Sequence, residues 1–374
     1  MSRILIVAGN ARSLIANRGD LIAELRRQGH AVSALVPEHD ALPELQDLGI
    51  AYELVGLDRR SMNARQDLAN CADLARRMRR LAPDVVFSYT IKPVVYGTLA
   101  ARLTRVPRVA SMITGMGYLF SGDSWRQRRG RLVSRLLYAL ALPLNDVVFF
   151  QNPDDRRALG RFGFLPLCRR AVLVAGSGVN LERFTVAPLP EGPPVFLLIA
   201  RLLRDKGVAE FVAAAAELRK DFPDARFQVL GPYDPLLPGS IPAGEIEAWR
   251  SAGVVSFHPG VKDVRPHIAR CSVFVLPSYR EGTPRSVLEA MAMGRPIVTT
   301  DAPGCRQTVI EGVNGFLVPS RQVTPLAEAM RRFLEAPHQI EAMGQRAREV
   351  AEQRFDVRRV NAVMIPFLLG MNAA

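Results

Sequence analysis

Short apolar runs alternate with helix-like segments along this chain, and this alternation restricts the possible folds more than any other feature. Strand-like runs occupy residues 3–9, 31–37, 51–57, 84–90, 106–114 and 146–152. The segments between them end at helix-stop residues, as residues 13–28 do at Gly29. Regular alternation of strand and helix is typical of parallel, doubly wound sheets. The sequence therefore predicts an α/β fold that binds ligands beyond the carboxyl ends of its strands.

Residues 277–304, PSYREGTPRSVLEAMAMGRPIVTTDAPG, predict the end of a strand, a tight turn and a helix. Thr283 is a good N-cap residue and Pro284 suits the first helical position. We therefore expect a helix from Pro284 to about Met293, with Gly294 just after its end. A helix that starts directly after a buried strand presents backbone N–H groups to an anion.

Two carboxylates flank this predicted helix start. Glu281 lies before it, and Glu289 lies inside the helix. Carboxylates are poor neighbours for phosphate but good acceptors for sugar hydroxyls, so the combination indicates a nucleotide sugar. The alternative is that Glu281 is a solvated loop residue and Glu289 an exposed helix residue. For an isolated pair of glutamates at this spacing, that alternative would be favoured.

A pair of cations upstream favours the functional interpretation. The apolar run 195–200 ends at Arg201, and Lys206 and Gly207 begin the next helix-like segment. Two cations where a strand meets a helix suit a diphosphate leaving group. Both could instead be solvated in a chain so rich in arginine, as we expect for Arg204.

The segment SYREGTPRSVLEAMAMGRPIVTTDAPGCRQTVIEGVNGFLVP, residues 278–319, resembles the Glu-x7-Glu region of family-4 retaining glycosyltransferases of the GT-B fold. Arg201 and Lys206 are similar to the family's basic pair. The resemblance implies two Rossmann-like doubly wound domains that face a central cleft. It implies an acceptor-side domain at 1–185, a nucleotide-sugar-binding domain at 195–355, and a segment 356–374 that crosses back to the first domain. The proline-rich residues 186–194 would be the linker.

The resemblance also implies roles for the candidate residues. Glu281 would orient hydroxyls of the donor sugar, Glu289 would accept hydrogen bonds from the ribose, and Arg201 and Lys206 would stabilise the departing diphosphate. We expect Glu281, Arg201 and Lys206 to be catalytic. The remaining donor-binding residues are expected to be Gly9, Gly231, Val261, Lys262, Gly282, Thr283, Pro284, Arg285 and Glu289. In the family, the loop that holds Val261 and Lys262 offers backbone groups to the base.

Glycine and polar residues end the strand-like runs of the first half. Gly9 resembles the family's glycine loop near the donor diphosphate, with one glycine rather than the usual pair. Each glycine alone is most simply a turn residue, but together they suggest one cleft. The acceptor-side residues are expected to be Arg18, Lys92, Thr114 and Gly115. Many family members carry a histidine near the end of the fifth strand, where this chain has residues 114–117, TGMG, so we assign no catalytic histidine.

Residues 124–144, SWRQRRGRLVSRLLYALALPL, predict a basic amphipathic helix. Its arginines are Arg126, Arg128, Arg129, Arg131 and Arg135, and its apolar positions are Leu132, Val133, Leu136, Leu137, Leu140 and Leu144. Such a helix suits an anionic membrane surface. The alternative is a crossover helix whose leucines pack on the sheet and whose arginines are solvated.

Composition sets outer limits on function. The 374 residues suffice for two domains, and the net charge of +13 favours nucleic acid, an anionic membrane or a phosphorylated substrate. Four widely spaced cysteines, Cys71, Cys168, Cys271 and Cys305, indicate neither a metal site nor a disulfide framework, and a reducing cytosol fits them best. The sequence has no signal-peptide pattern and no apolar run of membrane-spanning length. We therefore expect a cytoplasmic protein, peripheral on the inner face of the membrane.

Taken with the resemblance, these features predict a retaining, metal-independent glycosyltransferase without a cofactor. Residues 278–304 resemble transferases that extend undecaprenyl-diphosphate-linked oligosaccharides. The resemblance therefore favours a UDP-sugar as donor, with an N-acetylhexosamine as the sugar, and a polyprenyl-diphosphate-linked glycan as acceptor. A GDP- or other nucleotide sugar with a non-lipid acceptor is the alternative. A basic nucleic-acid-binding Rossmann protein is an alternative of another class, but no aromatic-interleaved basic patch supports it, and we expect no nucleic-acid partner. An epimerase would need GxGxxG and Tyr-x-x-x-Lys patterns, which the sequence lacks.

Overall fold

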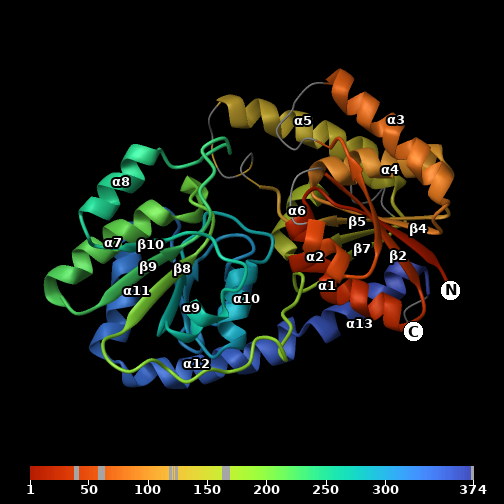
Figure 1. Ribbon diagram of the computed structural model, residues 1–374. Coiled ribbons are helices and arrows are strands. Elements are labelled where there is room, and N and C mark those ends of the chain that lie inside the picture. Colours follow the sequence, from red (N-terminus) through yellow and green to blue (C-terminus); the bar gives the residue numbers. More distant parts are fainter. Residues whose placement is uncertain are drawn as a thin grey trace. The chain divides into compact units, whose positions relative to one another are not determined.

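The computed structural model describes residues 1–37, 42–57, 64–117, 120, 122, 125–161 and 169–371. The chain forms two compact units (Figure 1), one made of Met1–Gly178 with Val357–Ala374 and the other of Val179–Asp356. Each unit contains one parallel sheet with helices between its strands, so the predicted α/β class is confirmed. Because the second unit begins at Val179, the proline-rich residues 186–194 lie inside it.

The first unit has a seven-stranded sheet in the order β3-β2-β1-β4-β5-β6-β7. Its strands are β1 (Arg3–Val7), β2 (Ala31–Pro37), β3 (Ala51–Val55), β4 (Val85–Tyr89), β5 (Arg108–Ile113), β6 (Val147–Phe150) and β7 (Ala171–Leu173). Its helices are α1 (Ala11–Arg27), α2 (Leu42–Asp47), α3 (Ala64–Leu81), α4 (Thr98–Leu103), α5 (Trp125–Ala141), α6 (Pro153–Arg161) and α13 (Val357–Leu369). A π-helical turn (Pro93–Gly97) precedes α4, and a 3-10 turn (Leu142–Leu144) follows α5.

Side chains of β1 show why this sheet is covered on both faces. Ile4 and Ile6 belong to a core that includes Leu14 of α1 and Val360 of α13. Their neighbours in sequence point the other way, and Leu5 belongs to a separate core on the side of α3 and α4. Successive residues of a strand face opposite sides of the sheet, so a continuous apolar run requires helices on both.

The second unit has a six-stranded sheet in the order β10-β9-β8-β11-β12-β13. Its strands are β8 (Val195–Ile199), β9 (Arg226–Leu230), β10 (Ser256–His258), β11 (Val273–Leu276), β12 (Ile297–Thr300) and β13 (Gly315–Val318). Its helices are α7 (Val208–Asp221), α8 (Ala243–Ser251), α9 (Arg265–Ala269), α10 (Arg285–Ala292), α11 (Val323–Glu335) and α12 (His338–Val350). Phe196 of β8 packs in a core with Phe211 of α7 and Phe333 of α11.

Helix α5 leaves most of its apolar positions uncovered. The side chains of Leu132, Leu136 and Leu140 are 59%, 59% and 63% exposed, and Trp125 is 62% exposed. The buried side of the helix carries Gln127, Ser134 and Tyr138 instead. The alternative in which these leucines pack on the sheet is therefore wrong. Ser124 and the side chain of Arg126 lie outside the described residues. Among the described residues, no helix has the length and apolar character needed to cross a membrane.

Three of the four cysteines are described, and the thiols of Cys71, Cys271 and Cys305 are buried and free. Burial raises the pKa of the Cys271 and Cys305 thiols to about 12. They are small core residues rather than reactive groups. Cys168 lies outside the described residues.

Candidate active site

In the second unit, the chain changes direction of winding between two neighbouring strands. Strands β8 and β11 are parallel neighbours. From β8 the chain continues to β9 and β10 on one side of the sheet, and then returns to β11, β12 and β13 on the other. Doubly wound sheets bind ligands beyond the carboxyl ends of the strands at such a switch point. The segments that follow β8 and β11 hold the predicted catalytic residues.

The turn after β8 presents Arg201 and Lys206. Arg201 is exposed directly beyond the strand, whereas Lys206 is buried at the end of a short 3-10 turn (Arg204–Lys206). Gly207 follows with a φ of +71°, a left-handed conformation that favours glycine. A Cβ atom on Gly207 would lie 2.2 Å from the carbonyl oxygen of Pro277. Glycine therefore lets the turn after β8 touch the backbone at the end of β11.

Lys206 and Glu281 meet across that contact. The Lys206 ammonium donates to Glu281 Oε1 at 2.6 Å, and the Ser278 hydroxyl donates to the same oxygen at 2.9 Å. The Glu281 backbone N–H donates to the Pro303 carbonyl at 2.9 Å. Gly304 has a φ of +83°, and a Cβ on it would lie 2.3 Å from the Glu281 carbonyl oxygen. The loop that carries Glu281 is thus fixed on both sides by close backbone contacts.

The surrounding charges keep Lys206 in its ammonium form. Burial by itself would lower the pKa of Lys206, but the carboxylates of Glu281 and Asp205 outweigh it and hold the pKa above its ordinary value. The pKa of Asp205 is raised, chiefly by burial. The charge of Arg201 acts to lower the pKa of both Asp205 and Lys206. The site therefore offers two cations beside an oriented carboxylate.

Helix α10 supplies the next pair of charges. Arg285 Nε donates to Glu289 Oε1 at 2.6 Å, and only 10% of the Glu289 side chain is exposed. The Ser286 hydroxyl donates to the Ile199 carbonyl at 3.0 Å, which joins the start of α10 to the end of β8. The predicted N-cap, Thr283, is wrong by one residue. Pro284 holds the N-cap position with a ψ of 110°, so helical geometry begins at Arg285.

Gly294 has a φ of +76° directly after the C-cap of α10, as predicted. The turn of Gly282 to Pro284 lies between the Glu281 loop and this helix. Gly282 and Pro284 are buried, and Thr283 is partly buried. Pro284 has no side-chain oxygen to bond the first N–H groups of α10.

Gly231 directly follows β9 and lies against the backbone that follows β8. A Cβ on Gly231 would lie 1.7 Å from the Ala200 carbonyl oxygen, so only glycine fits. Its N–H donates to the His258 carbonyl at 3.1 Å, which brings the loop after β10 alongside. Val261 and Lys262 are exposed in that loop.

The first unit has an equivalent switch point between β1 and β4. Gly9 follows β1, and a Cβ on it would lie 2.3 Å from the Thr90 hydroxyl oxygen. Thr90 follows β4 with a φ of +68°, which is uncommon and strained for a threonine. A π-helical turn begins three residues later, and such turns are frequent at functional sites.

Lys92 is held at this place by an aspartate that the sequence did not reveal. Its ammonium donates to Asp67 Oδ1 at 2.8 Å, and Tyr96 donates to Asp67 Oδ2 at 2.9 Å. Asp67 is buried near the start of α3. Burial, aided by Asp67, raises the pKa of Tyr96 well above its ordinary value.

The other acceptor-side residues lie after β5 and on α1. Thr114 and Gly115 follow β5 and are partly buried, and Gly115 has a φ of +103°. Arg18 is fully buried, with its guanidinium 5.2 Å from the Tyr89 ring centre. It also donates to the Ser177 hydroxyl at 3.3 Å.

Sequence reasoning missed Ser278 and Asp67. Ser278 had a usable signal, since it lies three residues before Glu281 at the end of β11. Asp67 had none, because it reaches Lys92 only through tertiary folding. Among the described residues, no group of three or more histidine, cysteine, aspartate or glutamate side chains is arranged to hold a metal ion.

Comparison with known proteins identifies the families that the two parts of the chain match. Residues 18–176 match the family described as "Glycosyl transferase 4-like domain", and residues 193–336 match "Glycosyl transferases group 1". The chain is similar to the N,N'-diacetylbacillosaminyl-diphospho-undecaprenol alpha-1,3-N-acetylgalactosaminyltransferase of Campylobacter jejuni, with 26% identity over 346 residues and 89% of each chain covered. It is also similar to the UDP-Gal:alpha-D-GlcNAc-diphosphoundecaprenol alpha-1,3-galactosyltransferase of Escherichia coli, with 24% identity over 81% of this chain and 80% of that one.

Among solved structures, sucrose-phosphate synthase from Thermosynechococcus elongatus superimposes with a TM-score of 0.81, at 18% identity, over 100% of both chains. That likeness confirms the predicted GT-B fold. The chain belongs to the glycosyltransferases of the GT-B fold, with a 4-like domain followed by a group 1 domain.

Proposed function

We propose that this glycosyltransferase moves an N-acetylhexosamine from a UDP-sugar to a polyprenyl-diphosphate-linked glycan, with retention of anomeric configuration and without a metal ion. It does so as a peripheral protein on the inner face of the cell membrane. The observation that carries the proposal is the Lys206–Glu281 pair beside Arg201 at the switch point of the second unit.

The donor assignment rests on the mixture of charges at this site. Arg201 and Lys206 match the negative charge that develops on a departing diphosphate, where stabilisation is often the largest catalytic term. Glu281 and Glu289 are carboxylates that accept hydrogen bonds from sugar and ribose hydroxyls. The two cations supply the positive charge that a metal ion supplies in other transferases. UDP is favoured because one similar transferase is named for a UDP-sugar.

Retention requires that the new bond to the anomeric carbon lie on the same face from which the nucleoside diphosphate departs. In the proposed step, the bond between the anomeric carbon and the phosphate oxygen breaks. A bond from the acceptor hydroxyl oxygen forms on the same face, and the hydroxyl proton passes to the departing phosphate oxygen. Glu281 is tied to Lys206 and Ser278, which suits a carboxylate that orients hydroxyls rather than one that attacks the sugar.

The acceptor assignment rests on two supports. Both similar transferases described above are named for diphospho-undecaprenol acceptors. In addition, α5 exposes Trp125, Leu132, Leu136 and Leu140 together with the exposed Arg128 and Arg129. An apolar stripe flanked by arginines suits the surface of an anionic bilayer, where a lipid-linked acceptor is found.

A donor screen tests the proposal. The purified protein is incubated in EDTA with a short-chain polyprenyl-diphosphate-linked sugar and with UDP-, GDP- and ADP-sugars in turn. We expect transfer from UDP-N-acetylhexosamines, undiminished by EDTA. Transfer from a GDP-sugar to a lipid-free acceptor would favour the alternative donor and acceptor. Absence of transfer or hydrolysis with every donor would contradict the assignment of the donor site.

A further inference from the structure

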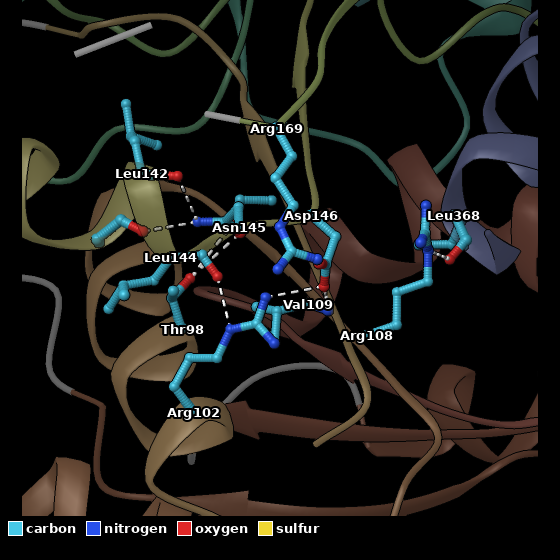
Figure 2. Close-up of polar contacts among 12 residues, drawn as sticks. Thr98, Arg102, Arg108, Val109, Leu142, Leu144, Asn145, Asp146, Arg169 and Leu368 are labelled. Carbon is cyan, nitrogen blue, oxygen red and sulfur yellow. Dashed lines mark hydrogen bonds and ion pairs between the residues drawn. The ribbon is translucent and has the colours of Figure 1, made fainter. Parts of the chain in front are cut away.

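In the first unit, several arginines lie together at the amino ends of the strands. Gly9 and Lys92 lie beyond the opposite, carboxyl ends. Arg108 begins β5, Asp146 immediately precedes β6, and Arg169 and Arg170 precede β7. Together they line a cavity of about 140 Å³ against Phe367 and Gly370 at the end of α13. Figure 2 shows Arg102 and Arg169 beside Asp146, and Arg108 turned toward Leu368. We call this cavity the arginine pocket, defined by Arg108, Asp146, Arg169 and Arg170.

The acidic residue of the lining is already neutralised. Asp146 accepts from Arg102 at 2.8 Å and from Arg169 at 2.9 Å, and it also accepts the Val109 N–H at 2.8 Å (Figure 2). One carboxylate with two guanidinium partners has no further charge to offer. The remaining arginines of the pocket must find their counter-charge elsewhere.

Arg108 and Arg170 have no carboxylate partner among the residues that the structure describes. Arg108 Nε donates to the Leu368 carbonyl at 2.9 Å, and Arg170 lies 5.7 Å from the centre of the Phe367 ring. These neutral partners leave two positive charges uncompensated. Burial is the main reason that the pKa of Arg108 is lowered, and the charges of Arg170 and Arg169 also lower it. Together these three effects outweigh the charge of Asp146, which raises it.

Gly370 leaves one side of the Arg108 guanidinium uncovered. Its φ is +78°, and a Cβ on it would lie 2.8 Å from Arg108 Nη1. Any other residue would crowd the guanidinium. Glycine keeps the guanidinium accessible from the cavity.

We propose that the arginine pocket binds a phosphate-type oxyanion, either a free phosphate or diphosphate or the phosphate of a lipid head group. Guanidinium groups match phosphate oxygens with two parallel hydrogen bonds, and several arginines in one pocket are typical of phosphate recognition. Arg102, which pairs with Asp146 of the lining, also donates from Nε to the carbonyl of Leu144 at 2.7 Å, in the 3-10 turn that follows α5. The guanidinium groups suit a free phosphate, and the link to the segment after α5 also makes a lipid phosphate a candidate.

The test uses adjacent arginine pairs of the same unit. Arg169→Ala/Arg170→Ala removes two arginines of the pocket, and Asp146 keeps its bond to Arg102. Arg156→Ala/Arg157→Ala, on α6, removes two exposed arginines and the same charge. Arg170→Ala alone breaks no ion pair with a described residue, so it tests the pocket even if the double variant folds poorly. All proteins carry Arg201→Ala and Lys206→Ala to remove the proposed donor site, and the melting temperature of each is compared.

Calorimetry with inorganic phosphate and diphosphate at constant ionic strength gives the free-anion result. We expect binding that weakens about tenfold in Arg169→Ala/Arg170→Ala and stays unchanged in the α6 variant, because each charge-assisted hydrogen bond contributes on that scale. Sedimentation with phosphatidylcholine vesicles containing phosphatidylglycerol gives the lipid result. Selective loss there, without binding of the free anions, identifies a lipid phosphate. If neither assay separates the pocket variants from the α6 variant, the proposal is overturned, whatever the outcome of the transfer assays.

Discussion

Lys206 and Glu281 are the residues whose replacement should cost the most activity. We predict that Lys206→Ala and Glu281→Gln each lower kcat about 100-fold or more, because Lys206 would stabilise the departing diphosphate and Glu281 would orient the donor sugar in the transition state. The measurement is the initial rate at saturating donor, with circular dichroism to verify folding. Arg204→Ala is the matched control. It lies on the same 3-10 turn but pairs with Glu245 at the surface, and it should keep near-normal activity. A variant of either pair residue with normal turnover would remove that residue from the site.

The buried thiols give a prediction about pH. Because burial raises the pKa of Cys271 and Cys305 to about 12, the reactive thiolate at pH 8 is roughly one molecule in 10⁴. Raising the pKa leaves less thiolate at a given pH, so both should resist iodoacetamide in the native protein and react once it is denatured. Mass spectrometry of tryptic peptides measures this. Rapid labelling of either cysteine in the folded chain would contradict the described packing.

Among elements, the turns after β11 and β12 come into contact because Gly304 has no Cβ atom. Gly304→Ala should destabilise the protein by about 1 kcal/mol for its left-handed φ and by about 1–3 kcal/mol more for the collision with the Glu281 carbonyl. Gly312→Ala separates these causes. Gly312 has a φ of +72° and nothing near its Cβ position, so only the first cost applies. Urea unfolding measures both, and equal destabilisation would show that the backbone contact is unimportant.

Helix α5 is the element that we expect to meet the membrane. Arg128→Glu/Arg129→Glu should release the protein from anionic vesicles, since each arginine near such a surface contributes about 1 kcal/mol. Leu136→Ser/Leu140→Ser should weaken binding even where charge is screened by salt. Hydrolysis of soluble donor should be unchanged in both. Co-sedimentation is the measurement, with Arg156→Glu/Arg157→Glu as the charge-matched control. If the wild type ignores anionic vesicles, the membrane role of α5 is wrong.

The elements also show what the sequence could and could not predict. Buried parallel strands are continuous apolar runs, so the sequence could predict the positions of the strands and the α/β class. Arg201, Lys206 and Glu281 could be chosen as candidates because each lies just beyond such a run. Helix starts were less certain. A proline has the same φ in an N-cap as in a first helical turn, and Pro284 takes the N-cap position that Thr283 was expected to hold. Asp67 could not be predicted, because its partner Lys92 is distant in sequence and only folding joins them.

At the scale of the whole molecule, the net charge of +13 is consistent with a protein that handles phosphorylated ligands. The basic residues with proposed roles form three separate groups. Lys206 and Arg201 flank the carboxylate of the candidate site, Arg128 and Arg129 lie exposed on α5, and Arg108 and Arg170 lack carboxylate partners among the described residues. The role proposed for each group is tested by a separate experiment, and any one of these roles can be wrong without affecting the others.

Transfer itself tests the central claim most directly. The protein is given α-linked UDP-N-acetylgalactosamine, labelled with ¹³C at the anomeric carbon, and a polyprenyl-diphosphate-linked sugar, and the product is followed by NMR. We predict an α-linked disaccharide on the lipid from the wild type and none from Glu281→Gln. A β-linked product would contradict the retaining mechanism, and transfer that persists in Glu281→Gln would contradict the site on which the account depends.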